Sequence, residues 1–368
     1  MSGSTRKGPL CGIKVVHLAS LGPGPYATML LADMGCDVVI VDRTVPTPAS
    51  VPAAQDPRRR GQRSIGLDLK KPEDHAILLK LISRADVLIE GMRPGVAERL
   101  GVGPETCRAL NPRLVYARIT GWGQDGPLAQ RAGHDINYIA LSGALHAMGA
   151  QQDIPSVPLN LLGDYAGGGL YTVLGILAAL LERAQSGLGQ VIDSAITDGV
   201  ASLCATNFGM LATGRWGERG TNAFDGSMPW YSVYRTKDGQ FVAVGAIEEP
   251  FFEELLRGVG LEPSQWPRHD AESRARLKCE LEARFASQDR AYWEAHFAES
   301  DGCVSPVLSF TESLSHPHHQ ARGTYTKVGN IPQPAPGPRL SRTPFAAPGP
   351  PPERGAQTED ILRELERD

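Results

Sequence analysis

The chain has 368 residues, more than one small hydrophobic core needs, and its length predicts two domains of ordinary size. With 41% hydrophobic and 21% charged residues, the composition is typical of a soluble globular protein. A net charge of -4 gives no reason to expect nucleic acid or an anionic membrane as a partner. Any anion-binding site must therefore come from a local cluster of basic residues.

The 6 cysteines are spread along the chain without a CxxC pair, and no secretory signal is recognisable at the N-terminus. This pattern favours reduced, buried thiols in a cytoplasmic protein. The longest apolar run, residues 170–181, is too short to span a bilayer and ends at Glu182 and Arg183. We therefore expect a soluble, cytoplasmic protein with no membrane partner.

The first third of the chain alternates short apolar runs with amphipathic segments. The runs expected as strands are residues 13–18, 38–41, 67–69, 87–89 and 114–119. One of the helices between them covers residues 73–83, with Pro72 at its first position. Such βαβ units build a parallel sheet with helices on both faces, and ligands bind at the carboxyl ends of its strands. The sequence therefore predicts an α/β fold with a Rossmann-like large domain.

The turn after the first expected strand is also compatible with a nicotinamide-dependent dehydrogenase. Residues 22–27, Gly-Pro-Gly-Pro-Tyr-Ala, fit the dinucleotide pattern G-x-G-x-x-G/A, and Asp42 lies where a ribose-binding acid would be. Pro23 and Pro25 argue against this interpretation, because they lack the N–H groups that bind a pyrophosphate. The next residue, Arg43, favours a phosphate at the end of the strand instead.

Basic residues gather around the expected carboxyl edge of the sheet. Each arginine alone is best explained as solvated surface charge. As a set they would suit a polyphosphate ligand; the set is Arg43, Arg58, Arg59, Arg60, Arg63, Arg93 and Arg99.

The second half predicts further helices and an antiparallel hairpin. Helices are expected at residues 167–185 and 197–213, around a strand at 190–195, and a hairpin at residues 231–247. Further helices are expected near residues 250–258, 272–286 and 290–298. We predict a large domain over residues 1–215 and a smaller α+β domain over 216–329. A Pro-rich passage then returns residues 330–368 to the large domain, ending in a helix that begins at Thr358.

Two short motifs place acid/base groups close together in sequence. The first is Gly-His-Asp-Ile-Asn-Tyr, residues 133–138, and the second is Gly-Asp-Tyr-Ala-Gly-Gly-Gly, residues 163–169. A lone histidine is more often structural, and Asp164 alone would be explained as a helix N-cap. Three glycines weaken a helix start, however, and they would let a ligand approach N–H groups that stabilise negative charge.

These motifs, with others along nearly the whole chain, resemble the family III CoA-transferase superfamily and, within it, the α-methylacyl-CoA racemases. The histidine of residues 133–138 is the specific feature, since the transferase branch usually lacks it. The wider resemblance lies in residues 12–19, 32–39, 68–70, 86–96, 120–124, 163–164, 245–248 and 303–307.

The resemblance implies an interlocked homodimer with each active site between two chains. It implies that His134, Asp164 and Glu248 are the proton-transfer residues, since Glu248 would orient an imidazole. It also implies a site for the CoA part of the substrate, formed by Arg43, Lys70, Arg93, Arg99, Gly133, Asp135 and Tyr138. No separate cofactor or metal is expected, and residues 316–319, His-Pro-His-His, are interpreted as a loop.

Interconversion of (R)- and (S)-2-methylacyl-CoA requires a base on each face of the α-carbon and stabilisation of an enolate. We expect His134 and Asp164 to be these two groups, with N–H groups at the helix start near Asp164 holding the enolate oxygen. The alternative within the superfamily is a CoA-transferase that uses Asp164 as nucleophile.

Overall fold

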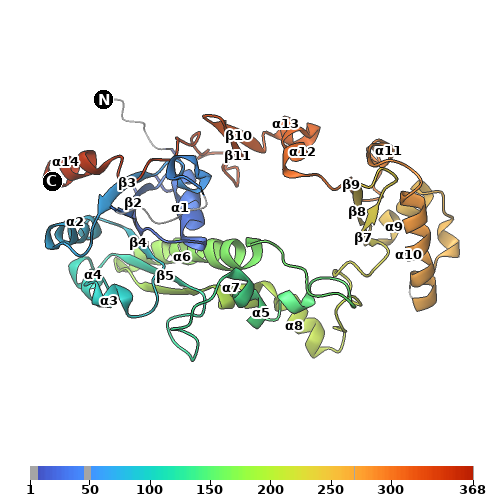
Figure 1. The fold of residues 1–368 in the computed structure, drawn as a ribbon, viewed down its shortest axis with the longest axis horizontal. Coiled ribbons are helices and arrows are strands. Elements are labelled where there is room, and N and C mark those ends of the chain that lie inside the picture. The colour runs from blue at the N-terminus through green and yellow to red at the C-terminus, as the bar shows by residue number, and fades with distance from the viewer. Residues whose placement is uncertain (1–6, 45–50, 269, 368) are drawn as a thin grey trace. The chain divides into compact units, whose positions relative to one another are not determined.

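The computed structural model describes residues 7–44, 51–268 and 270–367, which form two compact units (Figure 1). The first comprises the described residues of Met1–Ser142, Pro158–Leu203 and Gln320–Asp368, and the second comprises those of Gly143–Val157 and Cys204–His319. The predicted division placed residues 143–157 in the large domain. They belong to the second unit, where the Arg219 guanidinium donates to the carbonyl oxygens of Ala150 and Asp153 at 3.0 and 2.5 Å. No local pattern reveals this contact.

The first unit contains a parallel sheet with strand order β3-β2-β1-β4-β5-β6, the order of the Rossmann fold. The predicted parallel sheet of an α/β fold is therefore confirmed. Its strands are β1 Lys14–Leu18, β2 Asp37–Arg43, β3 Arg63–Leu67, β4 Val87–Glu90, β5 Val115–Thr120 and β6 Val191–Ala195.

The position predicted for β3 was wrong. Pairing with β2 runs from Val39 opposite Arg63 to Arg43 opposite Leu67, so β3 ends where its prediction began. Residues 68–70 turn instead, with the Lys70 N–H donating to Asp68 Oδ1 at 3.2 Å.

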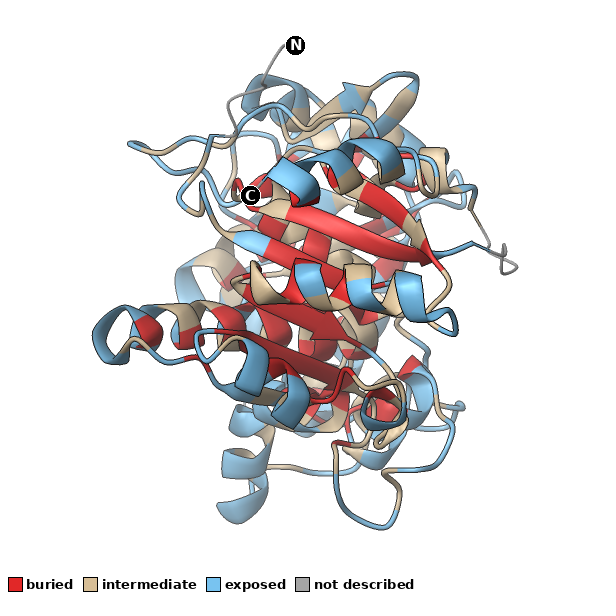
Figure 2. Cartoon of the chain, turned by 90° about the vertical axis from the view of Figure 1, so that its left-hand side faces the viewer, coloured by how far each residue is buried: buried red, intermediate tan, exposed pale blue. Residues whose placement is uncertain are grey.

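Helices cover both faces of the sheet because its strands are apolar on both sides. Val15 and Val16, neighbours on β1, belong to different core clusters. Figure 2 shows the strands buried between helices whose outer sides are exposed. The helices of this unit are α1 Pro23–Asp33, α2 Pro72–Ser83, α3 Val96–Arg99, α4 Pro104–Leu110, α5 Asp135–Leu141, α6 Tyr171–Ser186, α7 Ile196–Leu203 and α14 Thr358–Arg367, with the 3₁₀ turns η1 Ala53–Gln55 and η2 Pro57–Arg59.

A π-helix, η4 Leu161–Leu170, runs directly into α6. The pair forms a 26-residue helix, Leu161–Ser186, that by length and composition alone could cross a membrane. One side of α6 packs into the core, where Val173 and Ile176 are buried. The apolar run predicted at residues 170–181 is therefore part of a longer helix.

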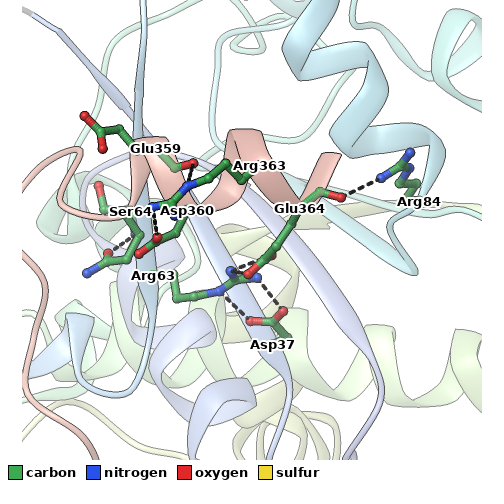
Figure 3. Close-up of polar contacts among 9 residues, drawn as sticks. Asp37, Arg63, Ser64, Arg84, Glu359, Asp360, Arg363 and Glu364 are labelled. Carbon is green, nitrogen blue, oxygen red and sulfur yellow. Dashed lines mark hydrogen bonds and ion pairs between the residues drawn. The ribbon is translucent and has the colours of Figure 1, made fainter. Parts of the chain in front are cut away.

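The C-terminal segment returns to the first unit. Strands β10 Tyr325–Val328 and β11 Ile331–Pro334 pair antiparallel, so part of the Pro-rich passage is a hairpin rather than an unpacked linker. The helix α14 then packs against β3 through Ile361 and Leu365. Figure 3 shows Arg63 between Asp37 and Glu364, at 2.6 and 2.8 Å.

The second unit has an antiparallel sheet, β7-β8-β9, with strands Tyr231–Arg235, Phe241–Gly245 and Val304–Pro306. The predicted hairpin is confirmed, since β7 pairs antiparallel with β8. The core between sheet and helices includes Tyr234, Phe252, Phe285 and Trp293. The helices are α8 Ala205–Ala212, α9 Glu249–Gly258, α10 Ala271–Phe285, α11 Arg290–His296 and α12 Phe310–Ser315, with α13 Pro317–Arg322 at the boundary and the 3₁₀ turns η3 Leu145–Ala147 and η5 Pro263–Gln265.

Candidate active site

His134 is the N-cap residue of α5, and its side chain is exposed. The Asn137 side chain fixes its backbone, because Asn137 Oδ1 accepts from the His134 N–H at 3.0 Å. The imidazole is therefore held at a helix terminus without being used for packing. An exposed imidazole on a fixed backbone is suited to exchange protons with a ligand.

Asp164 is the fourth residue of η4, whose N-cap is Asn160. The N-cap interpretation of Asp164 was therefore wrong, because its carboxylate lies beyond the start of the helix. Asn160 instead donates from Nδ2 to Asp164 Oδ2 at 3.3 Å. Sequence reasoning missed Asn160, although a residue four positions earlier faces the same side of a helix.

Asp135 links the two motifs. Its Oδ2 atom accepts a 2.6 Å hydrogen bond from the Asp164 main-chain N–H, so the start of α5 is fixed to η4. Its Oδ1 atom is buried and has no hydrogen-bond partner among the described residues. Gly163 is needed for this approach, since a Cβ there would lie 2.5 Å from Asp135 Oδ2.

The pKa of Asp164 is raised above its ordinary value. Burial is the largest cause, and the negative charge of Asp135 acts in the same direction. The Asn160 hydrogen bond and the charges of His134 and Arg58 act in the opposite direction. The structure thus brings His134 and Asp164 within electrostatic reach of each other, with a carboxyl group that takes up a proton more readily than usual.

The role predicted for the three glycines was wrong. Beta carbons at Gly167, Gly168 and Gly169 would meet Val200 Cγ2, Pro23 Cβ and Tyr26 Cδ1 at 2.6, 2.8 and 2.7 Å. The glycines therefore allow η4 to pack closely on α1 and α7, and they do not mark a helix start open to a ligand. The Asp164 N–H is likewise unavailable, since it is bonded to Asp135.

Tyr138 packs beneath the His134 loop. Its hydroxyl donates to the Gly133 carbonyl oxygen at 2.5 Å, and its ring meets Trp122 edge-on at 4.7 Å. The Tyr138 pKa is raised by burial and then by Asp164, while Arg93 opposes the shift. Trp122 was part of a family motif but received no role, and its Nε1–H is buried without a partner among the described residues.

The turn between β1 and α1 lies against Asp164. A Cβ on Gly22, which has φ 65, would lie 3.1 Å from both carboxylate oxygens. Asp42 is not available to bind the ribose of a dinucleotide, because it is 3% exposed and bound to Arg59 at 2.6 Å and to Ser64 at 2.6 Å. This argues against the dehydrogenase alternative.

Part of the proposed polyphosphate cluster is structural. Arg58, Arg59, Arg60 and Arg63 pair with Asp56, Asp42, Asp33 and Asp37, at 2.8, 2.6, 2.5 and 2.6 Å. The Arg60 pair is buried, at 2% exposure for both side chains. These four arginines hold their segments in place, so their prediction as a ligand site was wrong.

The remaining basic residues are exposed and follow strands of the sheet. Arg43 ends β2, Lys70 lies after β3, and Arg93 and Arg99 lie after β4. None of the four forms an ion pair with another described residue, in contrast to the arginines of η2. Parallel strands end at one edge, so the first three side chains follow the carboxyl edge of the sheet.

Glu248 belongs to the second unit. It is the exposed N-cap residue of α9, three residues after Gly245, the last residue of β8. Glu248 therefore belongs to a different unit from His134 and Asp164. In residues 7–44, 51–268 and 270–367, no three His, Cys, Asp or Glu side chains are grouped as a metal site.

The fold and the site define the class of protein. The family CoA-transferase family III matches residues 10–358, and the chain belongs to this family. The α-methylacyl-CoA racemase of Mus musculus is 45% identical over 360 residues, covering 96% of this chain and 93% of that protein. The Homo sapiens α-methylacyl-CoA racemase is 44% identical, covering 97% and 93%.

The fold agrees with a solved relative. A CAIB/BAIF family protein from Brucella suis superimposes with a TM-score of 0.84 at 27% identity, covering 98% of this chain and 100% of that one. The prediction of an enzyme of the racemase group within this family is confirmed by the similarity to both racemases.

Proposed function

We propose that this chain is a racemase that interconverts (R)- and (S)-2-methylacyl-CoA thioesters by 1,1-proton transfer through an enolate. The observation that supports this most strongly is the hydrogen bond between Asp135 and the Asp164 N–H, which fixes the start of α5, where His134 is exposed, to η4, where Asp164 has a raised pKa. Racemisation needs two such groups, because one must remove the α-proton while the other returns a proton to the opposite face.

His134 removes the proton from one epimer, and Asp164 in its protonated form donates to the other face. The roles reverse for the opposite epimer. The raised pKa of Asp164 suits this exchange, since the carboxyl group must be both a competent base and a competent acid. The enolate oxygen needs hydrogen-bond donors, and the candidates are first-turn N–H groups of α5 and η4 other than that of Asp164.

CoA binds along the carboxyl edge of the sheet. Arg43, Lys70, Arg93 and Arg99 contact its phosphates, and Gly133, Asp135 and Tyr138 form the wall at the thioester end. CoA is part of the substrate, and moving only a proton needs no further cofactor. Cys107, Cys204, Cys279 and Cys303 are thiols outside any disulfide, which agrees with the cytoplasmic location that we propose.

The working form is a homodimer with its active site between chains. Leu170 at the end of η4 and Leu174 and Leu181 of α6 lie on one side of the continuous helix and are 46%, 60% and 69% exposed. A soluble protein covers such a row, and a second copy of this chain is the partner we propose. Glu248 of the second copy then orients the His134 imidazole.

The test is α-proton exchange in deuterated water, using (R)-2-methylacyl-CoA. We expect deuterium at the α-carbon together with loss of optical purity. His134→Ala and Asp164→Asn should each lower this activity by two to four orders of magnitude, the usual contribution of a general acid or base. Full epimerisation by either variant would refute the assignment.

The same assay separates the alternatives. Transfer of CoA to a free acid, with Asp164 required and His134 dispensable, would indicate a CoA-transferase. A change in NADH absorbance would indicate a dehydrogenase.

A further inference from the structure

The turn from β8 into α9 carries Glu248, and one arginine contacts the residues on both sides of it. Arg268 Nη2 donates to the Ile247 carbonyl oxygen at 2.7 Å, and Arg268 Nη1 contacts Glu249 Oε2 at 3.1 Å. Glu248 lies between these two anchor points. Its own carbonyl oxygen accepts the first helical hydrogen bond, from the Phe252 N–H at 2.9 Å.

Two aromatic rings fix the Arg268 guanidinium. Its central carbon lies 4.3 Å from the ring centroid of Trp230 and 4.6 Å from that of Phe252. The rings themselves meet edge-on at 5.5 Å, and Phe252 is buried in the core of the second unit. A guanidinium stacked on rings keeps its planar donors in one orientation.

The exposure of the two side chains indicates how much the ion pair between Arg268 and Glu249 contributes. Arg268 is 15% exposed, whereas its partner Glu249 is 63% exposed. An exposed carboxylate adds little stability through such an ion pair. The remaining contacts are with the two rings and the Ile247 carbonyl group, so the arginine connects the core to the main chain next to Glu248.

We propose that Arg268 is a positioning residue of the active site, which acts by holding the backbone at Glu248 so that its carboxylate can orient an imidazole. This inference rests on the proposed function of Glu248. Arg268 itself touches neither the substrate nor the reacting atoms. Its role is to limit the positions that Glu248 can take, since small misplacements of a catalytic group are costly.

The variant that tests this is Arg268→Met, which keeps a long apolar side chain against the rings but loses every donor. We expect kcat for α-deuterium exchange to fall roughly ten- to a hundredfold, as for a misplaced catalytic group, while KM for the acyl-CoA changes by less than about twofold. Arg268→Lys should recover part of the rate, since one ammonium can reach the Ile247 oxygen but cannot stack in the same way.

A double-mutant cycle separates positioning from general stability. If Arg268 acts through Glu248, Arg268→Met should slow the enzyme in the wild-type background and have almost no effect in the Glu248→Gln background. The control is Arg257→Met on α9, because the one ion pair that Arg257 forms with a described residue is its exposed contact with Glu253. An equal loss of rate in both backgrounds would overturn the proposal.

Amide hydrogen exchange provides a readout that does not depend on activity. Peptides covering residues 245–256 should exchange faster in Arg268→Met than in the wild type or in Arg257→Met. If the wild type epimerises no substrate but this difference is present, the proposed function fails and the positioning contact stands. Unchanged exchange would refute the contact itself. Arg268→Lys, which loses the stacked guanidinium and keeps one donor, serves if Arg268→Met does not fold.

Discussion

Asp164 is surrounded by groups that shift its pKa in opposite directions. Burial and Asp135 favour the protonated carboxyl group, whereas Asn160, His134 and Arg58 favour the carboxylate. A residue that must act as acid in one direction and as base in the other needs this balance. The two short motifs identified this residue, but not the opposing groups, because Asn160 and Arg58 lie outside both motifs.

Arg58→Gln tests that balance. The amide can still donate to Asp56, whereas the positive charge that lowers the Asp164 pKa is lost. The carboxylate form is then less favoured, and the Asp164 pKa rises further. For the direction of epimerisation that uses Asp164 as the base, the acid limb of the profile of kcat against pH therefore moves to higher pH. Since Arg58 is 28% exposed, salt should reduce the effect.

The control has the same change in charge at a distant place. Arg363→Gln removes an exposed cation of α14, whose ion pair among the described residues is with Asp360, and should leave the profile unchanged. An acid limb that stays in place in Arg58→Gln would show that Arg58 does not influence the reacting carboxyl group.

At the scale of elements, the site depends on a close crossing of η4 and α7. A Cβ at Gly199 of α7 would lie 2.0 Å from the Gly167 carbonyl oxygen of η4. Neither helix can yield without shifting backbone, because the clashing atom belongs to the main chain. The glycines of η4 are therefore explained by packing, and Asp164 is held through that packing.

Gly199→Ala should destabilise the first unit by about 1–3 kcal/mol, the usual cost of overpacking. Gly209→Ala is the matched control, since Gly209 lies in the interior of α8 and a Cβ there would meet nothing within 4 Å. This second change should stabilise by up to about 1 kcal/mol through helix propensity. Chemical denaturation of both variants measures the difference, and equal stabilities would contradict the crossing.

The elements themselves were largely predictable from sequence, and their contacts were not. Strands β1, β2, β4 and β5 follow from apolar runs, because each is buried on both faces. Arg59, Arg60 and Arg63 were misinterpreted because their partners lie far away in the chain, as Asp33 does for Arg60. Gly167 was misinterpreted for the same reason, since only the fold brings Gly199 against it. Local patterns thus indicate which segments form, while contacts between distant segments decide what a polar or small residue does.

For the whole molecule, the proposed dimer makes a direct prediction at α6. Leu174→Lys places a charge in the exposed leucine row and should weaken self-association by at least about tenfold, because a lysine is costly in an apolar interface. The stability of one chain should change little, since Leu174 is 60% exposed. Sedimentation measures the association.

The control is Leu110→Lys, at the end of α4. Leu110 is also exposed, at 46%, but α4 lies on the opposite face of the sheet from α6, since its residue Cys107 belongs to the other core cluster. A monomeric wild type would refute the dimer.

A dimer with shared sites also predicts complementation between inactive chains. If Glu248 acts on the His134 of its partner, a heterodimer of His134→Ala and Glu248→Gln chains has one site with both wild-type residues and one site with neither. Random assembly makes about half of the dimers mixed, so co-expression should recover roughly a quarter of wild-type epimerisation. If Glu248 acts on its own chain, every site lacks one residue and the mixture stays as inactive as its components. The control mixes the two homodimers after each has been purified, and activity should rise only as their subunits exchange.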